Sequence, residues 1–248
     1  MELHIYGVPG MPEVAPNDDL GALIAAAVRQ AGRGVEPGDV FVVAQKVVSK
    51  AEGAIVRLDE VAPSPMAEQW ATESGKDPRV IEVILRESRR IVRMDRGILI
   101  TETRNGFVCA NAGVDASNVA PGFVTVLPRD PDASAERLRA ALSARGGGPV
   151  AMIVSDTFGR PWREGGVDVA LGVAGLQPLV DYRGSVDSFG RSLTSTVMAL
   201  ADEIAGAAEI VMRKSAATPV AIVRGTAEWA GAGNGRMLLR DAGHDLFR

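Results

Sequence analysis

The sequence has 248 residues, of which 46% are apolar and 23% are charged, and its net charge is −4. This length and balance predict a folded protein with a sizeable core, built as one large domain or as two closely packed lobes. The negative net charge and the scattered basic residues argue against a protein that binds nucleic acid by neutralising phosphates. The single cysteine, Cys109, excludes an internal disulfide and a thiolate metal site.

The N-terminus and the hydropathy pattern predict where the protein works. The chain starts without a basic stretch followed by a long apolar run, so we expect no signal peptide. No run of about 18 uninterrupted apolar residues predicts a transmembrane helix. Together with the single cysteine, this pattern predicts a soluble protein of the reducing cytoplasm.

The first half of the chain mixes short apolar runs with segments of helical periodicity. The run at 40–44 is continuously apolar and is therefore expected to be buried. Asn17, Asp18 and Asp19 predict a helix cap, and Asn105-Gly106 is a strong signal for a tight turn between two strands. The predicted elements are strands over 3–8 and 40–44, a helix over 20–31, helical structure over 64–90 with a new start at Pro78, and a hairpin of 97–101 and 107–110.

The second half begins with a helix that ends in a glycine-rich segment. Residues 146–149 read Gly-Gly-Gly-Pro, which stops the helix and predicts a hinge between two lobes. The predicted elements are helices over 134–145 and 194–208, and strands over 149–155 and 218–224. Helices and strands do not alternate strictly, so the chain is expected to adopt a mixed α+β fold rather than a doubly wound sheet.

Several common catalytic motifs are missing from the sequence. There is no phosphate-binding Gly-x-x-x-x-Gly-Lys-Ser/Thr loop, and the glycine-rich segment 231–235 fails the dinucleotide fingerprint. His4 and His244 lie at opposite ends of the chain and form no zinc-type pair, and no Gly-x-Ser-x-Gly elbow occurs. Any catalysis must therefore use carboxylates, lysines and the backbone.

Two segments with acidic residues are predicted as loops that follow strands. Residues 112–118 contain Asp115, and residues 155–165 contain Asp156 followed by the hydroxyl of Thr157. A carboxylate beside a hydroxyl suits Mg²⁺ or Mn²⁺ bridged to phosphate oxygens. The alternative, that each aspartate is a turn or cap residue, is favoured for either segment taken alone.

Two further segments supply positive charge. Residues 45–53 follow a buried strand and contain a Ser-Lys pair, in which Lys50 would attract phosphate as a compact charge. The alternative is a solvated turn. Residues 212–215 contain Arg213 and Lys214, which would donate to an anion or would merely lie near a helix C-terminus, where basic residues are common.

Taken in order, these segments resemble the coenzyme F420-0:L-glutamate ligase family. The resemblance extends from about residue 5 to 247, and its most specific motifs are Ser-Asp-Thr-Phe-Gly-Arg-Pro-Trp-Arg and Gly-Val-Asp-x-Ser-Asn. The segments that carry it are 10–14, 47–53, 112–118, 155–163 and 217–225.

The resemblance implies a reaction and a fold. GTP would phosphorylate the terminal carboxylate of coenzyme F420-0, and the amine of L-glutamate would displace phosphate to form an amide; a second round would add a γ-linked glutamate. We expect a two-lobed fold of the γ-glutamyl ligase type, with residues 1–248 as one domain, in an intertwined homodimer. Because the sequence stops shortly after residue 247, we expect it to lack the C-terminal flavin-binding domain of nitroreductase type that some relatives carry.

The resemblance also implies the site residues, with two divalent ions (Mg²⁺ or Mn²⁺) and K⁺ as the expected metals. Asp115 and Asp156 would hold one divalent ion and Thr157 would help to hold a second, which makes these three the expected catalytic residues. Segment 212–219 would complete the nucleotide pocket. The residues expected at GTP are Met11, Pro12, Glu13, Val14, Gln45, Lys46, Lys50 and Asn118.

Some assignments stay open at the level of sequence. Lys46 stands where relatives often have a small hydroxyl residue, so its role at the nucleotide is less secure than that of Lys50. Arg160, Arg163 and Tyr182 are the candidates for the acceptor pocket. The alternatives to the ligase are a GTP-using ligase or GTPase that acts on another carboxylate, and a non-catalytic protein that binds nucleotide or deazaflavin.

Overall fold

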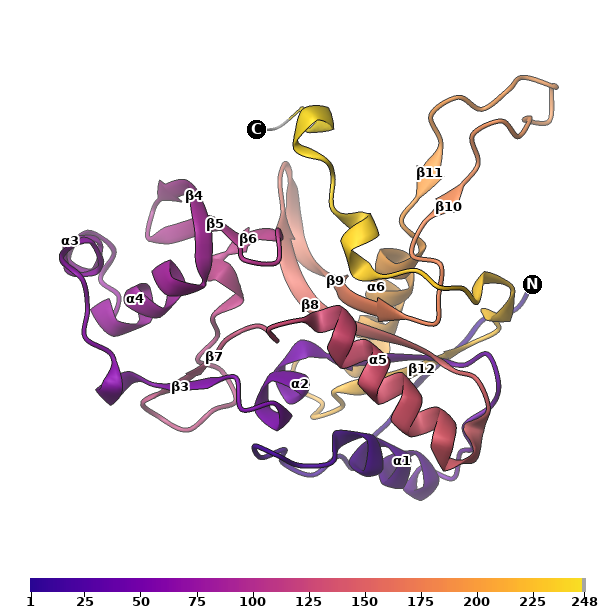
Figure 1. Cartoon of the computed structure of the whole chain (residues 1–248), viewed down its shortest axis with the longest axis horizontal. Helices are drawn as coiled ribbons and strands as arrows, with labels where there is room; N and C mark the ends of the chain where they lie inside the picture. Colours follow the sequence, from indigo (N-terminus) through magenta and orange to yellow (C-terminus); the bar gives the residue numbers. More distant parts are fainter. Residues whose placement is uncertain (247–248) are drawn as a thin grey trace.

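A five-stranded mixed sheet lies at the centre of the protein, in a computed structural model that describes residues 1–246 (Figure 1). Only β2 and β8 run parallel, and every other neighbouring pair is antiparallel. The strands lie in the order β1 (His4–Gly7), β12 (Val220–Arg224), β2 (Val40–Ala44), β8 (Ala151–Arg160) and β9 (Arg163–Ala174).

Helices cover both faces of this sheet. The face with Phe41 and Val43 packs against α1 (Leu20–Gln30), α2 (Gln45–Ala51) and α5 (Pro131–Leu142), and the face with Val40 and Val42 packs against α6 (Leu200–Met212). Successive side chains of a strand point to opposite faces, and here both faces are buried. This explains why β2 is apolar at every position.

A second group of elements lies beside the central sheet and has smaller cores of its own, around Trp70, Ile81 and Leu99 and around Leu58 and Val124 (Figure 1). It contains two small antiparallel sheets, β3–β7 and β4–β5–β6. Its elements are β3 (Ile55–Arg57), η1 (Leu58–Glu60), α3 (Pro65–Ser74), α4 (Pro78–Glu87), β4 (Ser88–Asp95), β5 (Ile98–Thr103), β6 (Val108–Ala110), η2 (Asn111–Gly113) and β7 (Phe123–Thr125).

A narrow two-stranded ribbon extends away from the rest of the protein (Figure 1). It consists of β10 (Val180–Asp181) and β11 (Val197–Met198), and we call residues 180–198 the arm. The remaining short helical segments are η3 (Ser143–Gly147), η4 (Ala227–Trp229), η5 (Gly235–Leu238) and η6 (Ala242–His244). Within residues 1–246, no helix combines the length and the apolar character needed to cross a membrane.

The α+β fold class is confirmed, and several elements lie where the sequence predicts them. Strand β2 has the predicted bounds, helix α1 begins at Leu20 with Asp19 as its cap, and β5 and β6 form the predicted hairpin. The proposed hinge at 146–149 includes residues 146 and 147, which lie outside the described side chains. A two-lobed domain with a hinge there therefore stays a prediction.

The structure corrects four of the predicted elements. Residues 155–160 are not a loop: β8 continues to Arg160 because β9, which the sequence analysis missed, pairs with it along this length. Residues 45–51 form helix α2 rather than a turn. The predicted helix at 194–208 begins only at Leu200, since the preceding residues belong to the arm, and the helical structure at 64–90 gives way to strand β4 at Ser88.

Candidate active site

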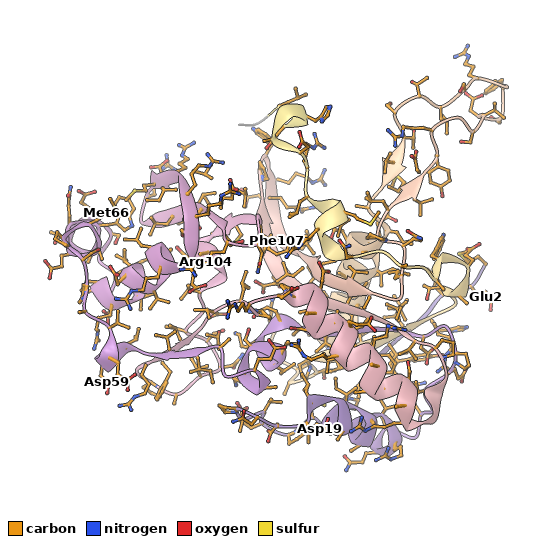
Figure 2. The ribbon with its side chains drawn as sticks, viewed as in Figure 1. Glu2, Asp19, Asp59, Met66, Arg104 and Phe107 are labelled. Atoms are coloured by element: carbon orange, nitrogen blue, oxygen red, sulfur yellow. The ribbon has the colours of Figure 1, made fainter. Side chains whose placement is uncertain are left out.

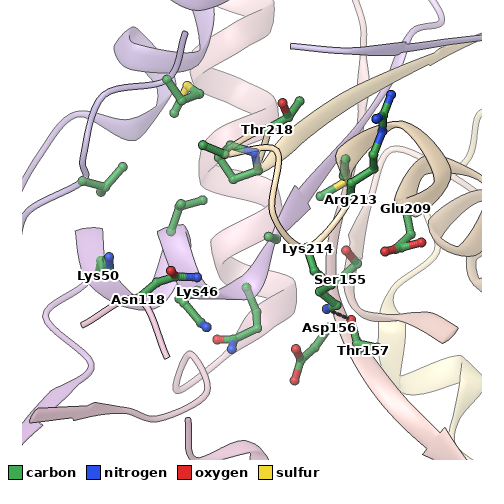
Figure 3. A pocket seen from close by; sticks show the side chains of 18 of the residues that line it. Lys46, Lys50, Asn118, Ser155, Asp156, Thr157, Glu209, Arg213, Lys214 and Thr218 are labelled. Atoms are coloured by element: carbon green, nitrogen blue, oxygen red, sulfur yellow. Dashed lines mark hydrogen bonds between the residues drawn. The ribbon is translucent and has the colours of Figure 1, made fainter. Parts of the chain in front are cut away.

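A pocket of about 360 Å³ lies at one edge of the central sheet, between the end of β2, the middle of β8 and the connection from α6 to β12 (Figure 3). Most of the connection from Met212 to Pro219 lines it, as does the segment that follows β1. Every residue that the sequence predicts to bind metal or GTP also lines this pocket: Met11, Pro12, Glu13, Val14, Gln45, Lys46, Lys50, Asp115, Asn118, Asp156 and Thr157.

The parallel pairing of β2 with β8 explains how two distant segments meet here. Ala44 is the partner of Ser155 in this pairing, so the residues that follow each of them leave the sheet side by side. After Ala44 the chain turns into α2 with Gln45 and Lys46, whereas after Ser155 it continues as a strand through Asp156. The carboxyl end of β2 and the middle of β8 thus form one edge of the pocket.

Asp115 is held in the pocket by a strained turn and by an ion pair. All three residues of η2 have positive φ, including the buried Ala112 at 52°, and a single residue separates η2 from Asp115. Lys46 Nζ lies 2.7 Å from Asp115 Oδ2, and the Ser117 N–H donates to Oδ1 at 2.7 Å. Burial alone would raise the pKa of Asp115, but these hydrogen bonds outweigh it and lower the pKa below its usual value.

Asp156 has the opposite electrostatic environment. Burial raises its pKa to about 6, although the Thr157 backbone N–H and the charge of Lys214 favour the ionised form. The nearby carboxylates of Asp168 and Asp115 contribute to this raised pKa. Burial and the charge of Asp156 also raise the pKa of Cys109 to about 12, so this thiol is a poor nucleophile.

A chain of polar side chains lines the strand side of the pocket. Ser155 and Thr157 lie two residues apart on one face of β8, and both donate to Asp168 on the neighbouring strand β9. Lys214 Nζ in turn donates to the Thr157 hydroxyl, a contact drawn in Figure 3.

Asp168 and Glu209 line the pocket but were missed in the sequence. A signal for Asp168 exists: residues 167–171 read Val-Asp-Val-Ala-Leu, an acidic residue within an otherwise apolar strand. Such a residue is buried only when it has polar partners. Glu209 lies in a helix with other acidic residues and has no comparable signal.

Helix α2 supplies the opposite wall of the pocket. The stem of Lys50 is buried, with 7% of its side chain exposed, and its ammonium pairs with the exposed carboxylate of Glu13. Gln45 is also buried and lies 2.8 Å from the hydroxyl of Ser49. Lys50 is therefore not a residue of a solvated turn: its charge is directed to one place at the rim of the pocket.

The oxygen atoms of the pocket fit a divalent cation. Asp115, Asp156 and Thr157 offer only oxygen, the donor that Mg²⁺ and Mn²⁺ prefer, and no side chain of residues 1–246 hydrogen-bonds the Asp156 carboxylate. Within the same residues, no three His, Cys, Asp or Glu side chains form a metal cage by themselves. Mg²⁺ rarely needs one, because it keeps waters and binds substrate phosphate.

The three acceptor candidates do not line this pocket. Arg160 and Arg163 lie at the turn between β8 and β9, where Arg160 Nη2 donates to the carbonyl oxygen of Glu164 at 3.0 Å. Tyr182 lies on the exposed arm. The structure therefore does not bring these three residues together with the predicted metal and nucleotide residues.

Comparison with known proteins gives the family. The family model described as F420-0:Gamma-glutamyl ligase matches residues 10–225. Coenzyme F420:L-glutamate ligase of Methanothermobacter thermautotrophicus is 47% identical over 100% of both chains. The protein with the same description from Methanopyrus kandleri is 49% identical, over 99% of this chain and 98% of its own length. The one from Archaeoglobus fulgidus is 39% identical, over 100% of this chain and 97% of its own length.

These relatives define the class of protein first: the chain is an enzyme, a ligase that forms an amide bond. More narrowly, it belongs to the F420-0:gamma-glutamyl ligase family.

Proposed function

We propose that this enzyme uses GTP to join L-glutamate to coenzyme F420-0, and then adds a γ-linked glutamate to the product. The observation that carries the proposal is the single pocket in which the expected carboxylates and lysines meet, in a chain of this family. The relatives from these three organisms are described as coenzyme F420:L-glutamate ligases, which supports both the acceptor and the incoming amino acid.

The reaction has two steps whose atoms balance. An oxygen of the acceptor carboxylate attacks the γ-phosphorus of GTP, the bond to the β-phosphate oxygen breaks, and GDP leaves. The amine of L-glutamate then attacks the carbonyl carbon of the acyl phosphate; phosphate leaves and the nitrogen loses a proton. Both steps depend on positioning and on neutralising phosphate charge, so no protein nucleophile is required.

The cationic side chains of the pocket suit the phosphates of GTP. Lys50 presents its ammonium from α2, and Lys214 presents a second one from the segment between α6 and β12. We infer that Lys50 and Asn118 contact GTP, with Gln45, Lys46 and the segment 11–14 beside it. Glu13 pairs with Lys50 and must release it when the nucleotide binds.

We further propose that Asp115 and Asp156 hold one divalent ion and that Thr157 helps to hold a second, with Mg²⁺ or Mn²⁺ as the metal and K⁺ as an additional ion. Bound there, a divalent cation would neutralise charge that develops on the phosphate oxygens. Asp115 supports this role because its lowered pKa keeps it ionised at neutral pH. Lys46 must move away from Asp115 to free the carboxylate.

We also infer that the enzyme acts as a homodimer. The support is the arm, which carries exposed apolar side chains along its whole length, including Tyr182, Val186 and Phe189. Apolar groups gathered on a protruding ribbon are typical of a surface that a partner covers. Location in the cytoplasm stays a prediction.

The test is to incubate the enzyme with GTP, Mn²⁺, L-glutamate and coenzyme F420-0, and to measure GDP and product mass. We expect GDP together with a product one glutamyl unit heavier, and later a second unit. Asp156→Asn should lower turnover by at least a hundredfold, since it removes a metal carboxylate. Asp202→Asn is the matched control, because Asp202 is partly buried yet lies outside the pocket, and it should keep turnover.

Two outcomes would contradict the proposal. Release of GDP that is independent of both glutamate and the acceptor would favour a GTPase or a ligase for another carboxylate. Unchanged binding of nucleotide or deazaflavin by Asp156→Asn, with no turnover in the wild-type enzyme, would favour a binding protein.

A further inference from the structure

Asp168 is a buried carboxylate at the wall of the pocket that has no assigned role. It lies in β9 with 5% of its surface exposed, and it lines the same pocket as Asp156. Its cross-strand partner is Thr157. An acidic side chain is rarely buried unless it is paired, so this position needs a physical reason.

The hydrogen bonds of Asp168 fix the direction of the Thr157 hydroxyl. Oδ1 of Asp168 accepts from Thr157 Oγ1, and Oδ2 accepts from Ser155 Oγ at 3.0 Å. A hydroxyl has one proton and two lone pairs. Because Asp168 takes the proton of Thr157, the lone pairs must point elsewhere, and the ammonium of Lys214 already binds one of them. A positively charged group therefore reaches this oxygen from the pocket.

The charge of Asp168 also stays largely uncompensated. In residues 1–246 its side-chain partners are the neutral hydroxyls of Ser155 and Thr157, and it forms no ion pair there. Asp156 is close enough to feel its charge, which adds negative potential to the pocket. Such a negative potential attracts cations, and in the absence of cations it lowers the stability of the folded protein.

We propose that Asp168 is a positioning residue: its carboxylate holds the Thr157 hydroxyl so that an oxygen lone pair faces a divalent cation in the pocket. This inference rests on the proposed function, which places a cation at Thr157. It goes beyond it by assigning the residue that orients this ligand. Partners of this kind in other metal sites change metal affinity by about 10- to 100-fold when they are mutated.

The test measures binding of Mn²⁺ alone to the metal-free enzyme by calorimetry, together with the thermal unfolding temperature. Asp168→Asn keeps the size of the side chain but removes its charge, and we expect at least a tenfold loss of Mn²⁺ affinity without a lower unfolding temperature. Asp168→Thr, which suits a strand, should show the same loss if the asparagine variant folds poorly. Asp202→Asn, a partly buried aspartate outside the pocket, is the matched control and should bind Mn²⁺ like the wild type.

The position of the hydroxyl gives a second readout. Thr157→Ser keeps the group that donates to Asp168 and should retain most of the affinity, which a general packing defect at this strand would not predict.

The outcomes separate this inference from the proposed function. A folded Asp168→Asn variant that binds Mn²⁺ like the wild type would overturn the positioning role while leaving the metal site intact. An equal loss in Asp202→Asn would also overturn it, because the effect would then belong to any lost carboxylate. A wild-type enzyme that binds no Mn²⁺ would overturn the metal part of the proposed function and this inference with it.

Discussion

At the scale of single residues, Lys46 and Asp115 show how one contact can serve two states. The ammonium of Lys46 lies 2.7 Å from Asp115 Oδ2 and 2.5 Å from the hydroxyl of Ser117. This pair satisfies a partly buried carboxylate when no other cation is near it. In the proposed reaction the same ammonium would turn to the nucleotide phosphates, where a flexible lysine acts as a point charge.

Replacing Lys46 separates these two roles. We expect Lys46→Met to raise the KM for GTP by about tenfold, the usual cost of one charge-assisted hydrogen bond. Binding of Mn²⁺ alone should be retained, because the substitution frees the Asp115 carboxylate. Steady-state kinetics and calorimetry measure the two effects. Asp115→Asn is the contrasting variant and should lose Mn²⁺ affinity; a weaker Mn²⁺ site in both would contradict the prediction.

Gly172 illustrates a close approach that only glycine allows. A methyl group built at this position in β9 would lie 2.0 Å from the carbonyl oxygen of Pro131, the first residue of α5. We expect Gly172→Ala to lower the free energy of unfolding by about 2 to 3 kcal/mol, because backbone must move to make room. Denaturant unfolding measures the change.

Gly159 in β8 is the matched control for this substitution. Nothing lies within 4 Å of a methyl group built there. Gly159→Ala should therefore change the free energy of unfolding by no more than about 0.5 kcal/mol. If both alanine variants lost the same free energy of unfolding, the close approach of α5 to β9 would not be the reason that position 172 requires glycine.

At the scale of elements, the hairpin formed by β8 and β9 determines how the site is built. Side chains two residues apart share one face of a strand. Ser155 and Thr157 can therefore both reach Asp168, whereas Asp156 between them faces a different environment, near Cys109. A loop at this place would not hold three polar side chains in fixed directions. Sheet pairing thus positions the three side chains of residues 155–157.

Helix α4 offers a test of local electrostatics that is far from the pocket. Asp77 caps this helix by accepting from the Arg79 N–H at 2.8 Å, and the Arg79 guanidinium binds both of its carboxylate oxygens. The hydrogen bond from the Arg79 side chain outweighs burial and lowers the pKa of Asp77. A lowered pKa in the folded state stabilises the protein above the pKa of the unfolded chain, and this gain is lost as the pH falls through the folded value.

Asp77→Asn isolates the ion pair, because asparagine is also a good helix cap. We expect a loss of about 0.2 to 1 kcal/mol in the free energy of unfolding at pH 7, the range for exposed ion pairs. At pH 2 the wild type has lost most of the gain, so the difference between the two proteins should shrink. Urea unfolding at both pH values measures this, and a difference independent of pH would contradict it.

At the scale of the whole molecule, the arm is the feature that a single chain leaves unexplained. Figure 2 shows its side chains surrounded by open space, and Phe189 near its tip is 88% exposed. The arm pairs only two short strands, β10 and β11, and two-stranded hairpins are only marginally stable alone. A second copy of the chain would cover these apolar groups.

The dimer can be tested by placing charge on the arm. Val186→Asp with Phe189→Asp should produce a monomer in sedimentation experiments, because two carboxylates would have to be buried in the interface. Met66→Asp, on the exposed surface of α3, is the matched control and should leave the mass unchanged. A wild-type protein that is already monomeric at micromolar concentration would contradict the proposal.

Local sequence signals predict the elements that are stabilised mainly by residues nearby in the sequence. The cap at Asp19, the Asn105-Gly106 turn and the continuous apolar run at 40–44 each predict their element within a few residues. The candidate site segments were predicted from the sequence as well, because their residue types resemble those of a known family. Their roles as metal and nucleotide ligands stay predictions, although the structure brings their residues into one pocket.

Only the tertiary structure decided which distant residues meet. Strand β9 and the extension of β8 to Arg160 depend on pairing with each other, which no local periodicity encodes. The same pairing sets Asp168 opposite Thr157, and the parallel register of β2 with β8 brings Lys46 towards Asp156. The sequence alone thus determined the family and the fold class, and it predicted the candidate metal and nucleotide residues that the structure brings into one pocket. Long-range strand pairing decided their geometry, since it depends on partners that lie far apart in the chain.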